Sequence, residues 1–159
     1  ISQGSQPILG FNYGAEKYSR VRQTYRYSVT LCTVIATIFF ICFQFFPHQI
    51  VGIFGNGSDL YFHFAEKYLR IFMLMTFANG IQPMSACFFT SIGKARLGVI
   101  MSLTRQVLFL LPLIVIFPVF FGIDGVMYAG PIADTSAFVL AVVFARRELG
   151  VMKAAEQNA

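Results

Sequence analysis

The sequence predicts an all-α integral membrane protein, folded as a polytopic helical bundle. Three observations lead to this class. Of 159 residues, 57% are hydrophobic and 12% are charged, and a soluble domain carries about twice that charged fraction. Uncharged stretches are long enough to cross a bilayer. Lysine and arginine gather in short segments between those stretches, as in the loops of membrane proteins.

The chain opens on the end of a membrane helix. We expect residues 1–13 to be the last part of a transmembrane helix that begins upstream, so that the chain is part of a longer protein. The segment QPILGFNYGAEKYSRVRQTYR then turns from apolar to basic. Residues 14–27 contain four basic side chains and are predicted to be a basic cytoplasmic loop. These four are Lys17, Arg20, Arg22 and Arg26.

Four transmembrane helices are predicted between residues 28 and 147. Their expected ranges are about 28–46, 62–92, 97–121 and 126–145. The first is an uncharged run that reaches about 28 Å as a helix, which is enough to cross the hydrocarbon core. Glycine and asparagine at 55–57 predict a loop before the second helix. Residues 148–159 are predicted to form a polar cytoplasmic tail.

The distribution of basic residues predicts the orientation of these helices. Residues 14–27, the turn with Lys94 and Arg96, and the end of the chain with Arg146 and Arg147 are basic. The intervening connections are neutral or balanced by acids. Under the positive-inside rule, the basic segments and the C-terminus are cytoplasmic. The location is then a plasma or inner cell membrane, crossed several times.

The polar residues inside the predicted helices are the candidate functional residues. Asp134 lies about 13 Å inside the last helix, where a carboxylate is unfavourable unless it faces protein, water or a cation. It is either a proton or substrate site, or a structural acid bonded to Thr135, Ser136 or a neighbouring helix. Asn79 and Gln82 form the polar centre of the second helix. We interpret Asn79, Gln82 and Asp134 as candidates for a substrate or ion pathway.

Arg105 and Gln106 lie inside the third predicted helix, about 12 Å from its basic turn. We expect Arg105 to extend its long side chain to the cytoplasmic interface; the alternative is a carboxylate partner on another helix. Gln106 either lines a cavity or bonds to a neighbouring helix. Both residues are candidates for polar contacts between helices.

Three prolines predict kinks in successive helices. Pro83, Pro112 and Pro131 each remove a backbone hydrogen bond and displace a carbonyl about one turn earlier. Exposed backbone at membrane depth is tolerated where it packs in protein or lines an aqueous cavity. Broken helices of this kind recur in secondary transporters, although packing alone also accounts for a kink.

Several classes of function are not supported by the residue pattern. The apolar composition argues against a nucleic-acid partner, despite the net charge of +5. His48 and His63 have no third ligand candidate nearby, so we expect no metal site. Cys32, Cys42 and Cys87 lack disulfide or zinc spacing. No nucleophile, base or metal constellation indicates an enzyme, and no cofactor is expected.

Three segments resemble the multidrug and toxic compound extrusion (MATE) family. They are QGSQPILGFNYGAEKYSRVR, SIGKARLGVIMSLTRQVLFLLPL and FGIDGVMYAGPIADTSAF, which occur in the same order as in the C-terminal lobe of that family. The resemblance covers nearly the whole chain except its polar tail.

The resemblance implies a transporter of two six-helix lobes, of which this chain would be a C-terminal lobe fragment. It implies alternating access, coupling to H⁺ or Na⁺, small organic substrates that are cationic or amphipathic, and an N-terminal lobe outside this chain. Some family members place an acidic cation ligand in the tenth helix. The corresponding segment here, residues 71–92, contains no acid, so the chain resembles members that couple through the N-terminal lobe.

Two other functions remain open at this stage. The first is a flippase for lipid-linked precursors from the same superfamily, which a more basic cavity would favour. The second is a small non-transporting subunit that scaffolds partners in the membrane. A complete gene product with its own N-terminal anchor would favour the scaffold.

Overall fold

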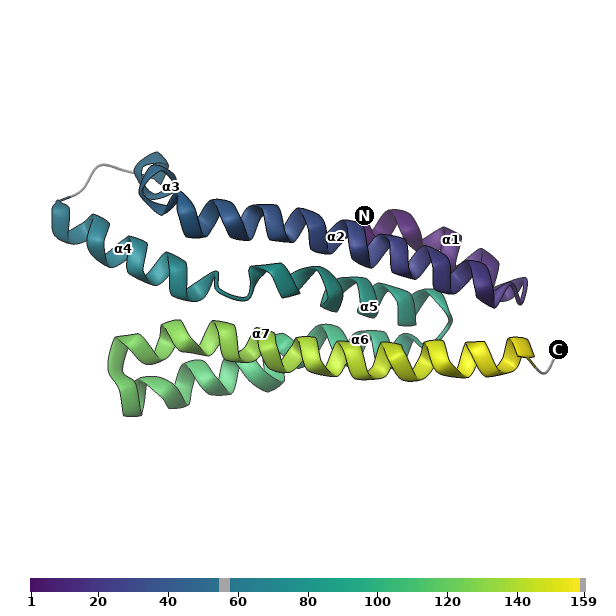
Figure 1. Ribbon diagram of the computed structural model, residues 1–159. Coiled ribbons are helices and arrows are strands. Elements are labelled where there is room, and N and C mark those ends of the chain that lie inside the picture. The colour runs from purple at the N-terminus through teal and green to yellow at the C-terminus, as the bar shows by residue number, and fades with distance from the viewer. Residues whose placement is uncertain (55–57, 158–159) are drawn as a thin grey trace.

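The computed structural model describes residues 1–54 and 58–157, which form an elongated helical bundle (Figure 1). In chain order the elements are α1 (Ser2–Gly14), α2 (Tyr18–Phe45), α3 (Pro47–Phe54), α4 (Asp59–Phe72), the 3-10 helix η1 (Thr76–Gly80), α5 (Ile81–Ser91), α6 (Ala95–Leu103), the π-helical segment η2 (Thr104–Leu110) and α7 (Leu111–Gln157). The loop predicted at 55–57 and the last two residues of the predicted tail lie outside the described residues. The all-α class is confirmed.

The described residues form up to four units that could cross a membrane. Three helical stretches are long and apolar enough to cross a bilayer: Tyr18–Phe45, Ala95–Gly122 and Asp124–Gln157. The fourth unit is a bent pair, Asp59–Phe72 and Thr76–Ser91, whose axes differ by 49°. The helices therefore form a polytopic bundle, as the sequence predicts. Which side of a membrane each end faces stays a prediction.

Two glycines make the reversals between the later helices. At Gly93, φ is +81°, and its N–H donates to Thr90 O while the N–H of Lys94 donates to Phe89 O. This pair of bonds is the Schellman motif, which ends a helix with a left-handed residue. Gly122 (φ +60°, ψ −144°) folds α7 back on itself. The Gly93 turn places α6 against α5, and the Gly122 reversal places η2 and the first arm of α7 beside its second arm (Figure 1).

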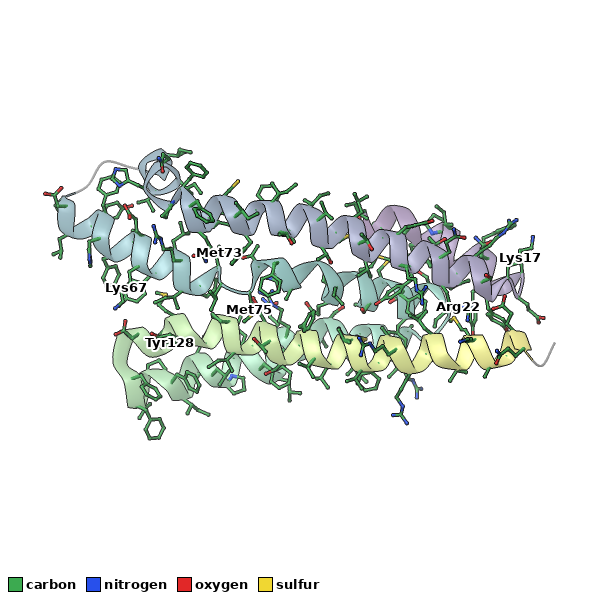
Figure 2. The ribbon with its side chains drawn as sticks, viewed as in Figure 1. Lys17, Arg22, Lys67, Met73, Met75 and Tyr128 are labelled. Atoms are coloured by element: carbon green, nitrogen blue, oxygen red, sulfur yellow. The ribbon has the colours of Figure 1, made fainter. Side chains whose placement is uncertain are left out.

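The basic segments gather at one end of the bundle. The α1–α2 turn, the α5–α6 turn and the C-terminal end of α7 lie together there, and α3 with the Gly122 reversal lies at the other (Figure 1). Lys17 and Arg22 mark the basic end in Figure 2, and Lys67 and Tyr128 mark the opposite end. This grouping of the basic segments is the one that the predicted topology requires.

The predicted loop over residues 14–27 is wrong in extent, because α2 already begins at Tyr18. Val21 and Tyr25 are spaced four residues apart and both are buried. They therefore lie on one face of the helix and pack into the core. The neighbouring basic residues Arg20, Arg22 and Arg26 occupy the other faces, so the high charge indicates a helix end outside the hydrocarbon layer rather than a loop.

The predicted tail is likewise an extension of α7, which continues to Gln157. Glu148 and Met152 are buried in this extension. They continue a stripe of buried alanines on α7, formed by Ala129, Ala133, Ala137, Ala141 and Ala145. Alanines four residues apart line one helix face and let neighbouring helices approach closely. The stripe explains why the polar end of the chain stays attached to the bundle.

The largest fully buried side chains lie in the half of the bundle nearest the basic end. Phe88 and Phe89 on α5 are fully buried. The ring of Tyr25 packs on Phe88 at 4.7 Å between centroids, and its hydroxyl shares a hydrogen bond of 2.7 Å with Ser85 Oγ. This core holds α1, α2, α5, α6 and α7 together. It leaves the polar residues discussed next in the middle of the bundle.

Candidate functional site

Asp134 is the central residue of a buried polar cluster. Its side chain is 5% exposed. Its Oδ1 accepts a hydrogen bond from Arg105 Nε at 2.5 Å, and its Oδ2 accepts one from Asn79 Nδ2 at 3.2 Å. Both carboxylate oxygens are thus satisfied by donors on other helices. We call these three residues the Asp134 cluster.

Each donor in the Asp134 cluster comes from an irregular helical segment. Asn79 lies in η1, which follows the bend flanked by Met73 and Met75 (Figure 2). Arg105 lies in the π-helical segment η2. Irregular segments of this kind are frequent at functional sites. They also turn side chains away from the direction that a regular helix would give them.

Two of the predicted prolines lie beside these irregular segments. Pro83 lies in the first turn of α5, directly after η1, where a missing N–H leaves no bond unmade. Pro112 is the second residue after η2; a proline ring clashes with the carbonyl four residues earlier, which here lies inside the π-helical segment. Pro131 lies inside α7, which stays α-helical around it. A kink at Pro131 therefore stays a prediction.

Gln82 points to a different neighbour from Asn79. Its Nε2 donates to the backbone carbonyl of Met101 at 2.9 Å, which joins α5 to α6. It also lines a cavity of about 160 Å³ with Thr104 and Leu108. Of the three predicted pathway residues, the structure therefore brings Asn79 and Asp134 together and leaves Gln82 on an adjacent wall.

The favoured expectation for Arg105 was wrong, and its alternative is what the structure shows. The guanidinium binds the Asp134 carboxylate instead of reaching the interface. A charge-assisted hydrogen bond inside the bundle is stronger than one in water, and it satisfies both charges. Gln106 is exposed, and among the described residues its side chain bonds to no other helix. Gln106 therefore does not join the Asp134 cluster.

Small residues set the position of the bend. A Cβ on Gly80 would lie 2.9 Å from the carbonyl carbon of Cys32 and 3.0 Å from the backbone nitrogen of Thr33. A Cβ on Gly130 would lie 2.7 Å from the ring of Phe72. Glycine at these two positions lets η1 approach α2, and α4 approach α7. The bend of the second spanning unit, and with it Asn79, is held in place by these approaches.

A cavity of about 410 Å³ lies beside the bend. Its walls come from α2, α4, α7 and the break before η1: Gln44, Arg70, Ile71, Leu74, Met75, Tyr128, Pro131, Ile132 and Thr135. The lining is mainly apolar, with a methionine and a tyrosine (Figure 2). Apolar and aromatic linings are typical of sites for small organic molecules. The sequence did not indicate this cavity, because its walls come from segments far apart in the chain.

Other polar pairs lie at the two ends of the bundle. At the basic end, Lys94 Nζ contacts both carboxylate oxygens of Glu148 at 2.6 Å. At the opposite end, Tyr68 donates to Asp124 at 2.6 Å. His48 pairs there with Glu66, whereas His63 is exposed. Within residues 1–54 and 58–157, no group of three potential ligands is placed to hold a metal ion, and the three cysteines are free.

The fold and the buried polar cluster define a multi-pass helical membrane protein with charged residues inside its bundle. The family model described as MatE matches residues 1–116. The chain therefore belongs to the MatE family, which confirms the resemblance noted in its sequence. No enzyme is among the relatives described below.

Curated relatives and solved structures agree with this assignment. The chain is 25% identical, over 97% of its length, to the multidrug export protein MepA of Staphylococcus saprophyticus. It is 23% identical over 90% of its length to MepA of Staphylococcus aureus. It superposes with a TM-score of 0.88 and 36% identity on the solved structure of the MATE multidrug transporter DinF-BH, over 96% of this chain.

The chain is shorter than all of these relatives. It covers 34% of the S. saprophyticus MepA and 34% of the DinF-BH chain. It thus spans about a third of their length. The predicted second lobe outside this chain is consistent with that difference.

Proposed function

We propose that the chain is the C-terminal part of a cation-coupled multidrug antiporter. In this proposal the parent protein exports cationic or amphipathic organic compounds by alternating access, driven by an H⁺ or Na⁺ gradient. Membership of the MatE family and the printed names of the relatives support export of small molecules. The parent protein lies in the plasma or inner membrane with its C-terminus in the cytoplasm.

The observation that carries the proposal is the Asp134 cluster. Ionisable residues inside a membrane bundle are unfavourable, and they mark ion pathways and relays. This cluster joins three spanning units at points where two of them depart from regular α-helix. A proton or cation that neutralises Asp134 removes its attraction for Arg105. Without this attraction, η1 and η2 are free to change conformation.

Coupling follows if the two arrangements differ in affinity for the ion and for the substrate. A ligand shifts a conformational equilibrium only by its differential affinity for the two states. In the proposal, Asn79, Gln82 and Asp134 lie along the pathway, and Arg105 competes with the coupling ion for the Asp134 carboxylate. The cavity beside the bend is the candidate site for the apolar part of a substrate.

The experiment uses the full-length parent protein in proteoliposomes. Efflux of a fluorescent cationic dye is measured under an imposed proton gradient and, separately, a sodium gradient. Wild type is compared with Asp134→Asn and with Asp124→Asn, a matched change at the turn outside the cluster. We expect gradient-driven efflux from wild type and Asp124→Asn, and loss of it in folded Asp134→Asn.

Two results would contradict the proposal at different levels. Unchanged efflux from Asp134→Asn would move coupling away from the Asp134 cluster and leave the antiporter proposal in place. Wild-type protein that moves no cationic dye under either gradient would sink the antiporter proposal itself.

A further inference from the structure

A basic groove lies between the starting turns of α2 and the end of α7. It encloses about 540 Å³ and is lined by Ser19, Arg22, Gln23, Arg26, Tyr27 and Lys153. Arg22 reaches across it to Glu156 at 2.5 Å. Among the described residues, Arg26 and Lys153 have no carboxylate partner. The groove therefore presents uncompensated positive charge at a helix–helix junction.

A second groove, which is apolar, lies farther along α2. It encloses about 390 Å³ and is lined by Val29, Thr30, Thr33, Val34, Thr37 and Ile38. The lining positions of both grooves on α2 follow one another at steps of three and four residues. Positions with that spacing lie on one helix face, and we call the two grooves along this face the track. From Arg26 to Ile38 the track runs for about 18 Å.

The lining of the track changes from basic to apolar near the expected edge of the hydrocarbon layer. Residues 28–46 carry no charge, and the last basic residue before them is Arg26. A helix of 28 residues such as α2 is about 42 Å long, whereas the hydrocarbon core is about 30 Å thick. The basic groove therefore belongs at the depth of the lipid headgroups, and the apolar groove belongs at the depth of the acyl chains. Arg22 marks this end of the bundle in Figure 2.

We propose that this track is a binding site for an anionic phospholipid. The phosphate contacts Arg26 and Lys153, and one acyl chain lies along the apolar groove of α2. Charge and hydrophobicity are arranged along the track in the same order as in the lipid. Basic grooves between transmembrane helices on the cytoplasmic side recognise anionic headgroups. A bound lipid would also stabilise the contact between α2 and α7 that Arg22 and Glu156 make. This inference does not depend on the transport mechanism.

The inference is tested on the purified full-length parent protein in detergent. Thermal unfolding is followed during titration with phosphatidylglycerol, and with phosphatidylcholine of the same acyl chains. The groove variant is Arg26→Gln with Lys153→Gln. The matched control is Arg146→Gln with Arg147→Gln, which removes the same charge from exposed positions on α7 outside the groove. We expect phosphatidylglycerol to raise the Tm of wild type and the control.

In the groove variant the apparent affinity for phosphatidylglycerol should fall by about fivefold for each cation removed. Equal weakening in the control would show a general charge attraction and overturn the site. An equal rise in the Tm of wild type with the two lipids would also overturn the site. This result is expected if another helix of the parent protein covers the track. If the groove variant does not fold, the affinity for phosphatidylglycerol is measured on Lys153→Gln alone, because Lys153 is at an exposed position.

The apolar groove is tested by its own pair of measurements. Val34→Trp fills the groove and should weaken phosphatidylglycerol binding, whereas Val115→Trp, at an exposed position outside the track, should not. Inorganic phosphate should not reproduce the rise in Tm, because it lacks the acyl chain. A full effect of inorganic phosphate would assign the basic groove to a soluble anion and contradict the lipid proposal.

Discussion

Arg105 and Asp134 are 29 residues apart in the sequence, yet the guanidinium Nε donates to the carboxylate Oδ1 at 2.5 Å. The pair joins η2 to the second arm of α7. Asp134 is almost fully buried, and Arg105 is 31% exposed. A buried charge that loses its partner is more destabilising than the loss of both charges together. This difference makes the interaction energy of the pair measurable by mutating each residue alone and both together.

A double-mutant cycle on Arg105 and Asp134 should show strong coupling. Asp134→Asn leaves Arg105 without its counter-charge, and Arg105→Gln leaves Asp134 without its own. The double variant removes both charges. Its loss in free energy of unfolding should be smaller than the sum of the losses of the two single variants. We expect a coupling energy of about 1–3 kcal/mol, measured by unfolding of the full-length protein in detergent. Additive single losses would show that the two charges do not stabilise each other.

Asn79→Asp should destabilise the protein more than Asn79→Ala. The side-chain amide of Asn79 donates to Asp134 at 3.2 Å, and an aspartate there places two carboxylates in direct contact. Like charges at this distance repel strongly inside a protein. The Tm of Asn79→Asp should be the lower of the two, and adding Asp134→Asn should restore most of the loss. If Asn79→Asp and Asn79→Ala had the same Tm, the side chains at positions 79 and 134 would not be in contact.

Gly80→Ala should destabilise the bend of the second spanning unit. The added Cβ would meet the backbone of Cys32 and Thr33 at 2.9–3.0 Å, and backbone cannot move aside as a side chain does. Forcing extra volume into a packed contact costs about 1–3 kcal/mol. The matched control is Gly150→Ala, where nothing lies within 4 Å. Alanine in the middle of an exposed helix should instead stabilise by about 0.5–1 kcal/mol. A neutral Gly80→Ala would mean that η1 and α2 are farther apart.

The class of fold was predictable because it depends on local properties of the sequence. Uncharged runs predicted the spanning units, and the basic segments predicted which ends of the helices gather together. The start of α2 was missed because charge alone suggested a loop. The spacing of Val21 and Tyr25, four residues apart, was the available signal that the charges lie on a helix, and both side chains are buried in the structure.

The candidate site was predictable only in part. Polar residues at membrane depth singled out Asn79, Arg105 and Asp134 individually, since any of them is unfavourable in hydrocarbon. Their mutual contact depends on the 3-10 and π-helical segments, whose side-chain directions no regular periodicity gives. The same limit applies to Glu148, whose partner Lys94 lies 54 residues away. It applies also to the cavity beside the bend, whose walls come from separate segments.

Glu148→Gln should destabilise the basic end of the bundle more than Glu156→Gln. Both carboxylates bind a basic side chain, but Glu148 is 11% exposed and Glu156 is 40% exposed. Glu148 also contacts Lys94 through both oxygens at 2.6 Å. A charge-assisted bond with one buried partner contributes about 2 kcal/mol, whereas an exposed pair contributes less than about 1 kcal/mol.

The measurement is hydrogen exchange on the full-length protein, read at the α5–α6 turn and at the end of α7. Glu148→Gln should speed exchange in both segments together, because the ion pair connects them. Glu156→Gln should affect mainly the end of α7 and the start of α2, where Arg22 lies. If Glu148→Gln changed only α7, the turn at Lys94 would be held by its own Schellman bonds rather than by the ion pair.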